Sequence, residues 1–203
     1  MLRILPRLSL ILLLCGCISA PSTDPARLPA GEWRLDPDHA SVTWQIRHLG
    51  LSWYTGRFDR LDATLSFDPQ APEGASLSAI VETGSISTAN APFDAMLRGR
   101  AWFDAEDHPQ IVFESDSLEI IGENTARLTG RLTLKGRTRN QTMDVRFYGG
   151  NFNFLEGRDA IGFSGDMIVD RTEFGIGFLP PGLIGDEVRI HIEAEFLREP
   201  DNP

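Results

Sequence analysis

The dominant pattern along the chain is an alternation of apolar and polar residues with a period of two. Over residues 41–48, Val42, Trp44 and Ile46 alternate with polar side chains, and residues 187–196 repeat the pattern. Such alternation is typical of β-strands with one buried face. Shorter runs predict further strands at 62–67, 76–82, 109–121, 126–134, 141–148 and 160–169.

One segment departs from this period and has the features of a short α-helix: Pro92 near its start, Phe93, Met96 and Leu97 at helical spacing, and Gly99 near its end. Residues 122–124 and 134–138 contain the glycines typical of hairpin turns. The predicted fold class is therefore all-β, with one short helix and about eight to ten antiparallel strands.

A sheet of this size with one apolar face must fold over to bury that face, as a sandwich or as a closed barrel. Closure also removes exposed strand edges, and a barrel of roughly eight strands can hold one small ligand inside. A transmembrane barrel alternates too, with its apolar face towards lipid. The charged alternate positions of residues 189–195 would then crowd a narrow lumen. The pattern therefore favours a soluble barrel with an apolar interior.

The N-terminus has the pattern of an export signal. Arg3 and Arg7 precede an apolar run from Leu8 to Cys17, which is too short to span a bilayer. Leu14, Gly16 and Cys17 resemble a bacterial lipobox, and this resemblance implies cleavage before Cys17 and acylation of that cysteine. An ordinary signal peptide with a chance cysteine is the alternative. A disulfide to Cys15 is disfavoured because it would close almost no loop.

These features predict four segments: a lipoprotein signal peptide at 1–16, a flexible tether at 17–31, a barrel domain at 32–198 and a tail at 199–203. Cleavage would remove two arginines from a chain of formal charge −10, which leaves −12. This acidic balance argues against nucleic acid and against electrostatic attachment to anionic lipid.

The sequence resembles the YceI-like, polyisoprenoid-binding proteins over roughly residues 33–196. The matching stretches are "WRLDPDHASVTWQIRHLGLSWYTGRFDRLDATLSFDP" (33–69), "SISTANAPFDAMLRGRAWFDAEDHPQIVFES" (85–115), "LTGRLTLKGRT" (128–138) and "DRTEFGIG" (170–177). The resemblance implies a lipocalin-like barrel in the cell envelope that binds a polyisoprenoid or an isoprenoid quinone. Ala40 stands where the family pattern has serine, and Trp102 replaces a phenylalanine. Dimerisation is common in that family, but these residues do not predict it.

The inward phase of the strands gives the predicted lipid-binding wall: Trp44, Ile46, His48, Phe58, Leu65, Phe67, Leu77, Val81, Phe113, Val145, Ile190 and Ile192. Core packing is the alternative role for each of them. His48 would offer a hydrogen bond to a quinone carbonyl, or serve structurally. Arg98 and Arg171 are the predicted head-group residues, with surface ion pairing as the alternative. The four histidines lack the spacing of a metal site, and neither a metal nor a cofactor is predicted.

No nucleophile elbow, phosphate-binding glycine loop or HExxH motif is present, so the chain is not predicted to be an enzyme. We expect an envelope lipoprotein that sequesters or transports an apolar isoprenoid-type lipid on the periplasmic face. Ile18 after the cysteine resembles signals for the outer membrane. The alternative is an envelope interaction or stress protein that uses a solid barrel as a scaffold.

Overall fold

The computed structural model describes residues 20–177, 179 and 182–200. The predicted signal peptide and Cys17 lie outside these residues. The described chain is mostly strand, and the strands are β1 (Gly31–His48), β2 (Ser52–Phe58), β3 (Leu61–Phe67), β4 (Ser76–Glu82), β5 (Ile86–Ser87), β6 (Gln110–Gly122), β7 (Thr125–Leu134), β8 (Arg137–Asn153), β9 (Arg158–Asp170) and β10 (Ile184–Arg198). The helices are α1 (Ala91–Arg98) and four 3₁₀ turns at Pro25–Arg27, Pro72–Gly74, Thr83–Ser85 and Arg171–Phe174.

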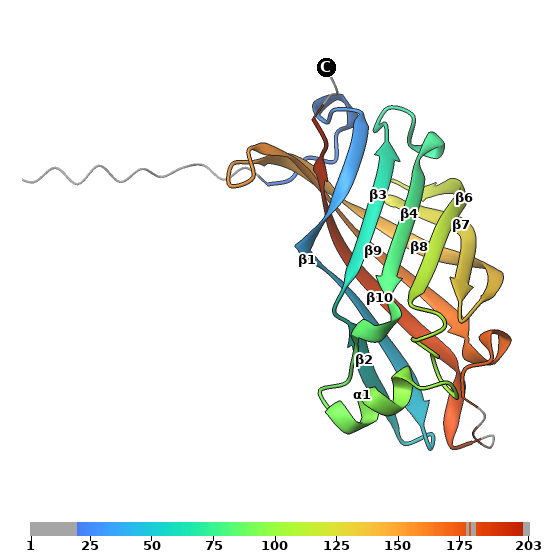
Figure 1. The fold of residues 1–203 in the computed structure, drawn as a ribbon. Helices are drawn as coiled ribbons and strands as arrows, with labels where there is room; N and C mark the ends of the chain where they lie inside the picture. The colour runs from blue at the N-terminus through green and yellow to red at the C-terminus, as the bar shows by residue number, and fades with distance from the viewer. Residues whose placement is uncertain (1–19, 178, 180–181, 201–203) are drawn as a thin grey trace, which may run out of the picture.

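Eight of the strands close into an antiparallel barrel in the order β1–β3–β4–β6–β7–β8–β9–β10, with β10 paired back onto β1 (Figure 1). This confirms the predicted fold class. Most neighbours in the ring are consecutive in sequence, and the turns from β6 to β7, β7 to β8 and β8 to β9 are short. In the β7–β8 turn, Lys135 and Gly136 have φ of +50° and +70°, the left-handed conformation that suits a two-residue hairpin.

Strand β1 pairs with β10 and also with two other strands, each over a different part of its length. Its first residues, 31–34, pair with β3, whereas residues 42–48 pair with β2. The short β5 then extends the sheet beyond β2. The alternation of the sequence did not predict β2 or β5 as strands. The closed barrel decides which half of β1 pairs with β2 and which with β3.

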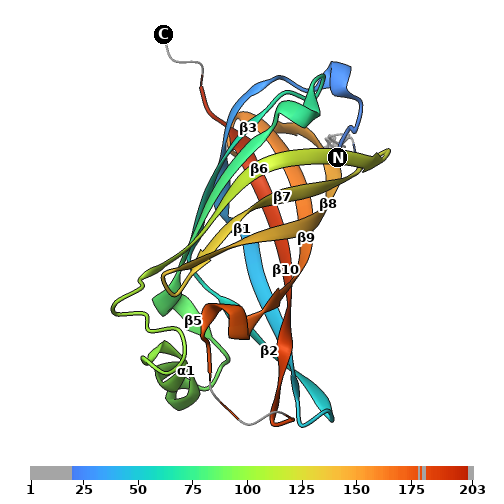
Figure 2. The same ribbon diagram turned by 90° about the vertical axis from the view of Figure 1, so that its right-hand side faces the viewer.

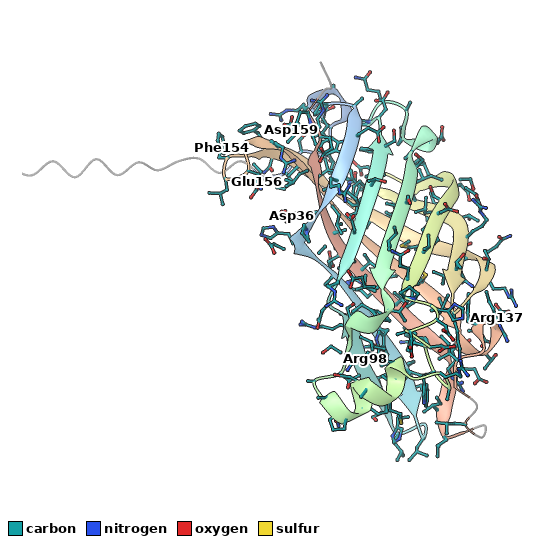
Figure 3. The ribbon with its side chains drawn as sticks, viewed as in Figure 1. Asp36, Arg98, Arg137, Phe154, Glu156 and Asp159 are labelled. Atoms are coloured by element: carbon teal, nitrogen blue, oxygen red, sulfur yellow. The ribbon has the colours of Figure 1, made fainter. Side chains whose placement is uncertain are left out.

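A large bulge interrupts β1. Four residues, 36–39, stand opposite the single residue Glu195 of β10, because Leu35 pairs with Phe196 and Ala40 with Ala194. Pro37 within this bulge has no backbone N–H for the ladder. The structure keeps these residues within one bent strand (Figure 3).

Helix α1 lies across the end of the barrel where β2 runs (Figure 2). Asn90 caps it by accepting a hydrogen bond from the backbone N–H of Phe93 at 3.3 Å. Leu97 is buried and Phe93 packs against the same cluster, but Met96 is exposed. The predicted helix is therefore confirmed.

The segment before β1 packs on the barrel from Ser22 onwards. Ser22 forms an isolated antiparallel bridge with Gly150 of β8, and Leu28 is buried. The part of the predicted tether between these residues is thus held against β8. No helix within the described residues is long and apolar enough to cross a membrane.

Candidate functional site

The barrel encloses an apolar cavity of about 290 Å³. Alternate residues of all eight barrel strands line it, together with β2, α1 and the loop that carries Trp102 and Phe103. The volume lies just below the range of roughly 300–1,000 Å³ typical of small-molecule sites. We call this space the barrel cavity.

Several inward-facing side chains of the barrel are only half-buried. Leu77 and Ala79 on β4, Val145 on β8, and Ile190 and Ile192 on β10 all line the cavity and pack against core clusters. Their remaining exposure is therefore exposure to the barrel cavity. The interior is hollow at the level of these residues, and is not filled by the protein's own side chains.

An aromatic cluster borders one end of the barrel cavity. Phe163 of β9 lies at its centre, with ring centroids 5.8 Å from Phe67, 5.1 Å from Phe147 and 6.1 Å from Phe196. The contacts with Phe67 and Phe196 are edge-to-face, a favourable geometry for aromatic pairs. Together with the fully buried Trp33, these rings fill the end of the barrel that lies opposite α1.

A second cluster covers the other end. Val42, Trp44 and Phe58 pack there against Leu97 of α1, and the ring of Phe103 meets Phe58 edge-on at 5.7 Å. Helix α1 and the loop after it thus lie over the apolar wall. The helix is held to the preceding chain by Asp94, whose buried carboxylate accepts hydrogen bonds from the backbone N–H and hydroxyl of Thr88 at 2.8 and 2.6 Å.

The structure brings all twelve predicted wall residues to the barrel cavity. They are Trp44, Ile46, His48, Phe58, Leu65, Phe67, Leu77, Val81, Phe113, Val145, Ile190 and Ile192. That they bind lipid stays a prediction. Phe163, Met143, Met167 and Val169 also line the cavity but were not predicted. In β9, apolar residues alternate with others and so indicate which side chains point inward. Gly162 and Gly165 obscure this alternation because they have no side chain.

His48 lies at the rim of the cavity. It is exposed, and the pairing of β1 with β10 shifts register between Ile46 and His48. The period-two pattern placed it on the inner wall, and it lines the cavity as the last residue of β1. Apart from it, few polar side chains line the cavity, so a ligand inside would meet an almost wholly apolar surface.

Arg171 lines the barrel cavity but is occupied by the protein itself. Its Nη1 donates to the carbonyl oxygens of Ile176 and Gly177 at 2.7 and 3.0 Å, and its Nε donates to that of Gly185 at 2.8 Å. Its Nη2 forms an ion pair with Asp186 at 2.8 Å. The guanidinium thus ties the loop after β9 to the start of β10.

Arg98 does not share a site with Arg171. It lies on α1 (Figure 3), is absent from the cavity wall, and donates to the carbonyl oxygen of Gly84 at 3.3 Å. The two predicted head-group residues therefore serve different parts of the structure. Their role towards a phosphate stays a prediction.

A polar cluster lies at the bulge of β1, on Asp36, His39 and Glu195. One ligand atom of each lies within 4.8 Å of the others. The carboxylate of Asp36 contacts His39 Nδ1 at 2.8 Å and accepts the backbone N–H of Asp38 at 3.1 Å. Spacing along the sequence could not reveal this cluster, because Glu195 joins it across the β1–β10 pairing.

The two members of the ion pair shift each other's pKa in opposite directions. Burial acts to raise the pKa of Asp36, but the hydrogen bonds from His39 and Asp38 outweigh it and hold the pKa below its ordinary value. The hydrogen bond to Asp36 raises the pKa of His39. The pair therefore favours a charged imidazolium at the bend of β1.

Comparison with known proteins agrees with this architecture. A UPF0312 protein of Pseudomonas aeruginosa (strain LESB58) is 30% identical over 172 residues, which cover 84% of this chain and 88% of that protein. The crystal structure of BcnA from Burkholderia cenocepacia superposes with a TM-score of 0.73 at 23% identity, covering 79% of this chain and 98% of BcnA. A polyisoprenoid binding domain from Saccharophagus degradans has a TM-score of 0.64 at 11% identity, covering 84% of this chain and all of that domain. These two structures share the fold.

The model of the YceI-like domain matches residues 33–196. These residues run from the third residue of β1 to Phe196, near the end of β10. The match therefore includes every strand of the barrel, helix α1 and the whole cavity wall. The chain belongs to the YceI-like family.

Proposed function

We propose that this protein binds an apolar, isoprenoid-type lipid, a polyisoprenoid or an isoprenoid quinone, inside the barrel cavity. The observation that carries the proposal is a hollow interior with an almost wholly apolar wall. Burial of a hydrocarbon tail against this wall supplies the affinity, since each buried CH₂ contributes about 0.8 kcal/mol. The shared fold of the polyisoprenoid binding domain from Saccharophagus degradans supports the same class of ligand.

The position of the polar groups suggests how the ligand is oriented. A polar head inside the cavity would lose its hydrogen bonds to water and find few replacements, which is costly. The head therefore lies at the rim, where the exposed imidazole of His48 is available as a donor or acceptor. The tail extends towards the aromatic cluster around Phe163.

Acylation of Cys17 would hold the protein beside the membrane that supplies its ligand. The lipobox-like residues Leu14, Gly16 and Cys17 support this part of the proposal, together with an outer-membrane location on the periplasmic face. The N-terminal peptide of the membrane-extracted protein should carry diacylglycerol and a fatty acid on Cys17, as measured by mass spectrometry. An unmodified N-terminus at another residue would contradict the anchor without touching the proposal for the cavity.

The alternative role is that of a scaffold with a solid barrel. It requires an interior filled by the protein's own side chains, and the half-buried wall residues such as Ala79 and Ile190 count against it. We therefore propose a binding protein, and not an enzyme or a scaffold.

The test is native purification followed by mass spectrometry of an organic extract. We expect a co-purified isoprenoid lipid, and uptake of an isoprenoid quinone by the delipidated protein. The variant Ala79→Phe, which places a ring in the cavity, should lose both. Ser78→Phe is the matched control, because Ser78 is exposed on the outer face of the same strand. Well-folded wild-type protein that is free of lipid and takes up no quinone would rule the proposal out.

A further inference from the structure

The β8–β9 hairpin carries an exposed apolar tip. It projects sideways from the barrel, near the end opposite α1 (Figure 1), and Figure 3 shows Phe154 at its tip. Phe154 is 87% exposed and Leu155 is 95% exposed, which makes them the most exposed large apolar side chains of the described residues. Phe152 is half-exposed and meets Phe154 edge-on, with ring centroids 5.2 Å apart. We call Phe152, Phe154 and Leu155 the hairpin tip.

The turn that presents these side chains is well hydrogen-bonded. The backbone N–H groups of Leu155 and Glu156 donate to Asn153 Oδ1 at 3.0 and 3.3 Å. The N–H of Gly157 donates to the carbonyl oxygen of Asn153 at 2.8 Å. The turn thus fixes the backbone with two large apolar groups directed to the outside.

The N-terminal segment crosses the base of the same hairpin. Ser22 and Gly150 exchange two backbone hydrogen bonds, of 2.8 and 2.9 Å. The crossing needs a residue without a side chain on β8, because a Cβ at Gly149 would lie 2.7 Å from the carbonyl oxygen of Ser22. The sequence Gly149–Gly150 is therefore what allows the N-terminal segment to lie at this place.

Chain length links the hairpin tip to the anchor. Cys17 precedes Ser22 by five residues, which span at most about 17 Å. Phe154 follows Gly150 by four residues, or about 13 Å of strand. The distance to Cys17 and the distance to Phe154 are both measured from the Ser22–Gly150 bridge, and they are of similar length. An acyl group on Cys17 would therefore hold the hairpin tip at the surface of the same bilayer.

We propose that the hairpin tip inserts into the interfacial region of a phospholipid bilayer beside the acyl anchor. This inference rests on the anchor in the proposed function. Apolar contact drives the insertion, because basic residues do not outnumber acidic ones near the tip. Arg158 lies 4.0 Å from Glu156 and 3.7 Å from Glu199. Asp159 adds a further carboxylate. A zwitterionic membrane is therefore sufficient, and anionic lipid is not required.

Two contacts, the anchor and the tip, would orient the barrel on the membrane. The β1–β2 turn, where Leu51 is 83% exposed, lies at the end of the barrel that carries α1 (Figure 1). That end would stay in water while the hairpin tip is in lipid. The two exposed apolar sites therefore give a matched pair of reporters.

The experiment uses full-length protein purified from membranes and reconstituted into phosphatidylcholine vesicles that contain brominated lipid. Tryptophan is introduced by Phe154→Trp in one variant and by Leu51→Trp in the other. After subtraction of the signal of wild type, whose four native tryptophans are common to both variants, we expect the indole at the hairpin tip to shift its emission to shorter wavelength and to be quenched by bromine. The indole at the β1–β2 turn should emit as in buffer.

Equal quenching of both variants, quenching only at the β1–β2 turn, or no quenching at all would overturn the inference. Protein that fails to float with the vesicles would overturn it as well. The mass of the N-terminal peptide, measured on the same samples, separates the two proposals. An acylated Cys17 with an unquenched tip rejects the tip alone, whereas an unmodified Cys17 rejects the anchor on which it rests.

Discussion

Filling the barrel cavity from Ala79 should raise the stability of the lipid-free protein. Ala79 lies on β4, faces the cavity and packs against both the cluster around Phe113 and the aromatic cluster around Phe163. It is half-buried and lines the barrel cavity. The substitution Ala79→Phe adds a ring at this point.

The size of the cavity sets the expected magnitude. A cavity of about 290 Å³, at roughly 24 cal/mol per Å³, corresponds to about 7 kcal/mol of lost packing. That is comparable with the whole free energy of unfolding of a typical domain, about 5–15 kcal/mol. Burial of a phenylalanine ring is worth about 1.5–3 kcal/mol. The lipid-free variant should therefore be more stable than lipid-free wild type by up to about 1.5–3 kcal/mol.

The sign of this change distinguishes a hollow barrel from a solid one. In a filled interior the same ring would overpack the core and cost about 1–3 kcal/mol. The assay is urea unfolding of both delipidated proteins, followed by tryptophan fluorescence and extrapolated to water. Ser78→Phe, which adds the same ring on the outer face, should leave the free energy of unfolding nearly unchanged. A loss of 1 kcal/mol or more (about the lower limit for overpacking) in Ala79→Phe alone would refute the hollow interior.

Three further predictions concern single side chains. Arg171→Gln should lower the free energy of unfolding by about 2–5 kcal/mol in urea titrations, because it leaves buried carbonyl groups without donors; a loss below that range would show that the guanidinium does not hold the loop. Gly56→Ala should alter the near-ultraviolet circular dichroism and reduce quinone uptake, since its Cβ would lie 2.2 Å from a ring carbon of Trp44; an unchanged spectrum would contradict this. The contribution of His39 to the free energy of unfolding should be complete below its unfolded pKa of about 6.5. It should fall as the pH rises through the higher folded pKa, because the hydrogen bond to Asp36 favours the charged imidazolium. His39→Gln should abolish that part of the pH dependence of the urea midpoint, and identical pH profiles would show that the pair adds no stability.

The alternation of residues was sufficient to predict the wall of the cavity. Because successive side chains of a strand point to opposite faces, Val42, Trp44 and Ile46 had to share one side of the sheet, and so did Ile190 and Ile192. The order of hairpins then left few ways to bury these faces other than closure. The pattern did not show where a strand is irregular, as at the bulge of residues 36–39 opposite Glu195.

The polar clusters depended on contacts between distant parts of the chain. Asp36 and His39 meet Glu195 only because the bulge in β1 lies opposite β10. Arg171 was predicted as a head-group residue from its charge and position near a turn. The structure instead surrounds its guanidinium with protein acceptors from the following loop and from β10.

The sequence by itself determined the helix, most of the strands with their inward faces, and the apolar character of the interior. The tertiary structure alone decided that the interior is hollow, where the cavity ends, and that the N-terminal segment crosses the base of the β8–β9 hairpin. The physical reason is that the period of two fixes which face of a single strand each side chain points to. Volume and long-range contact depend on how many strands close the ring and in which register they pair.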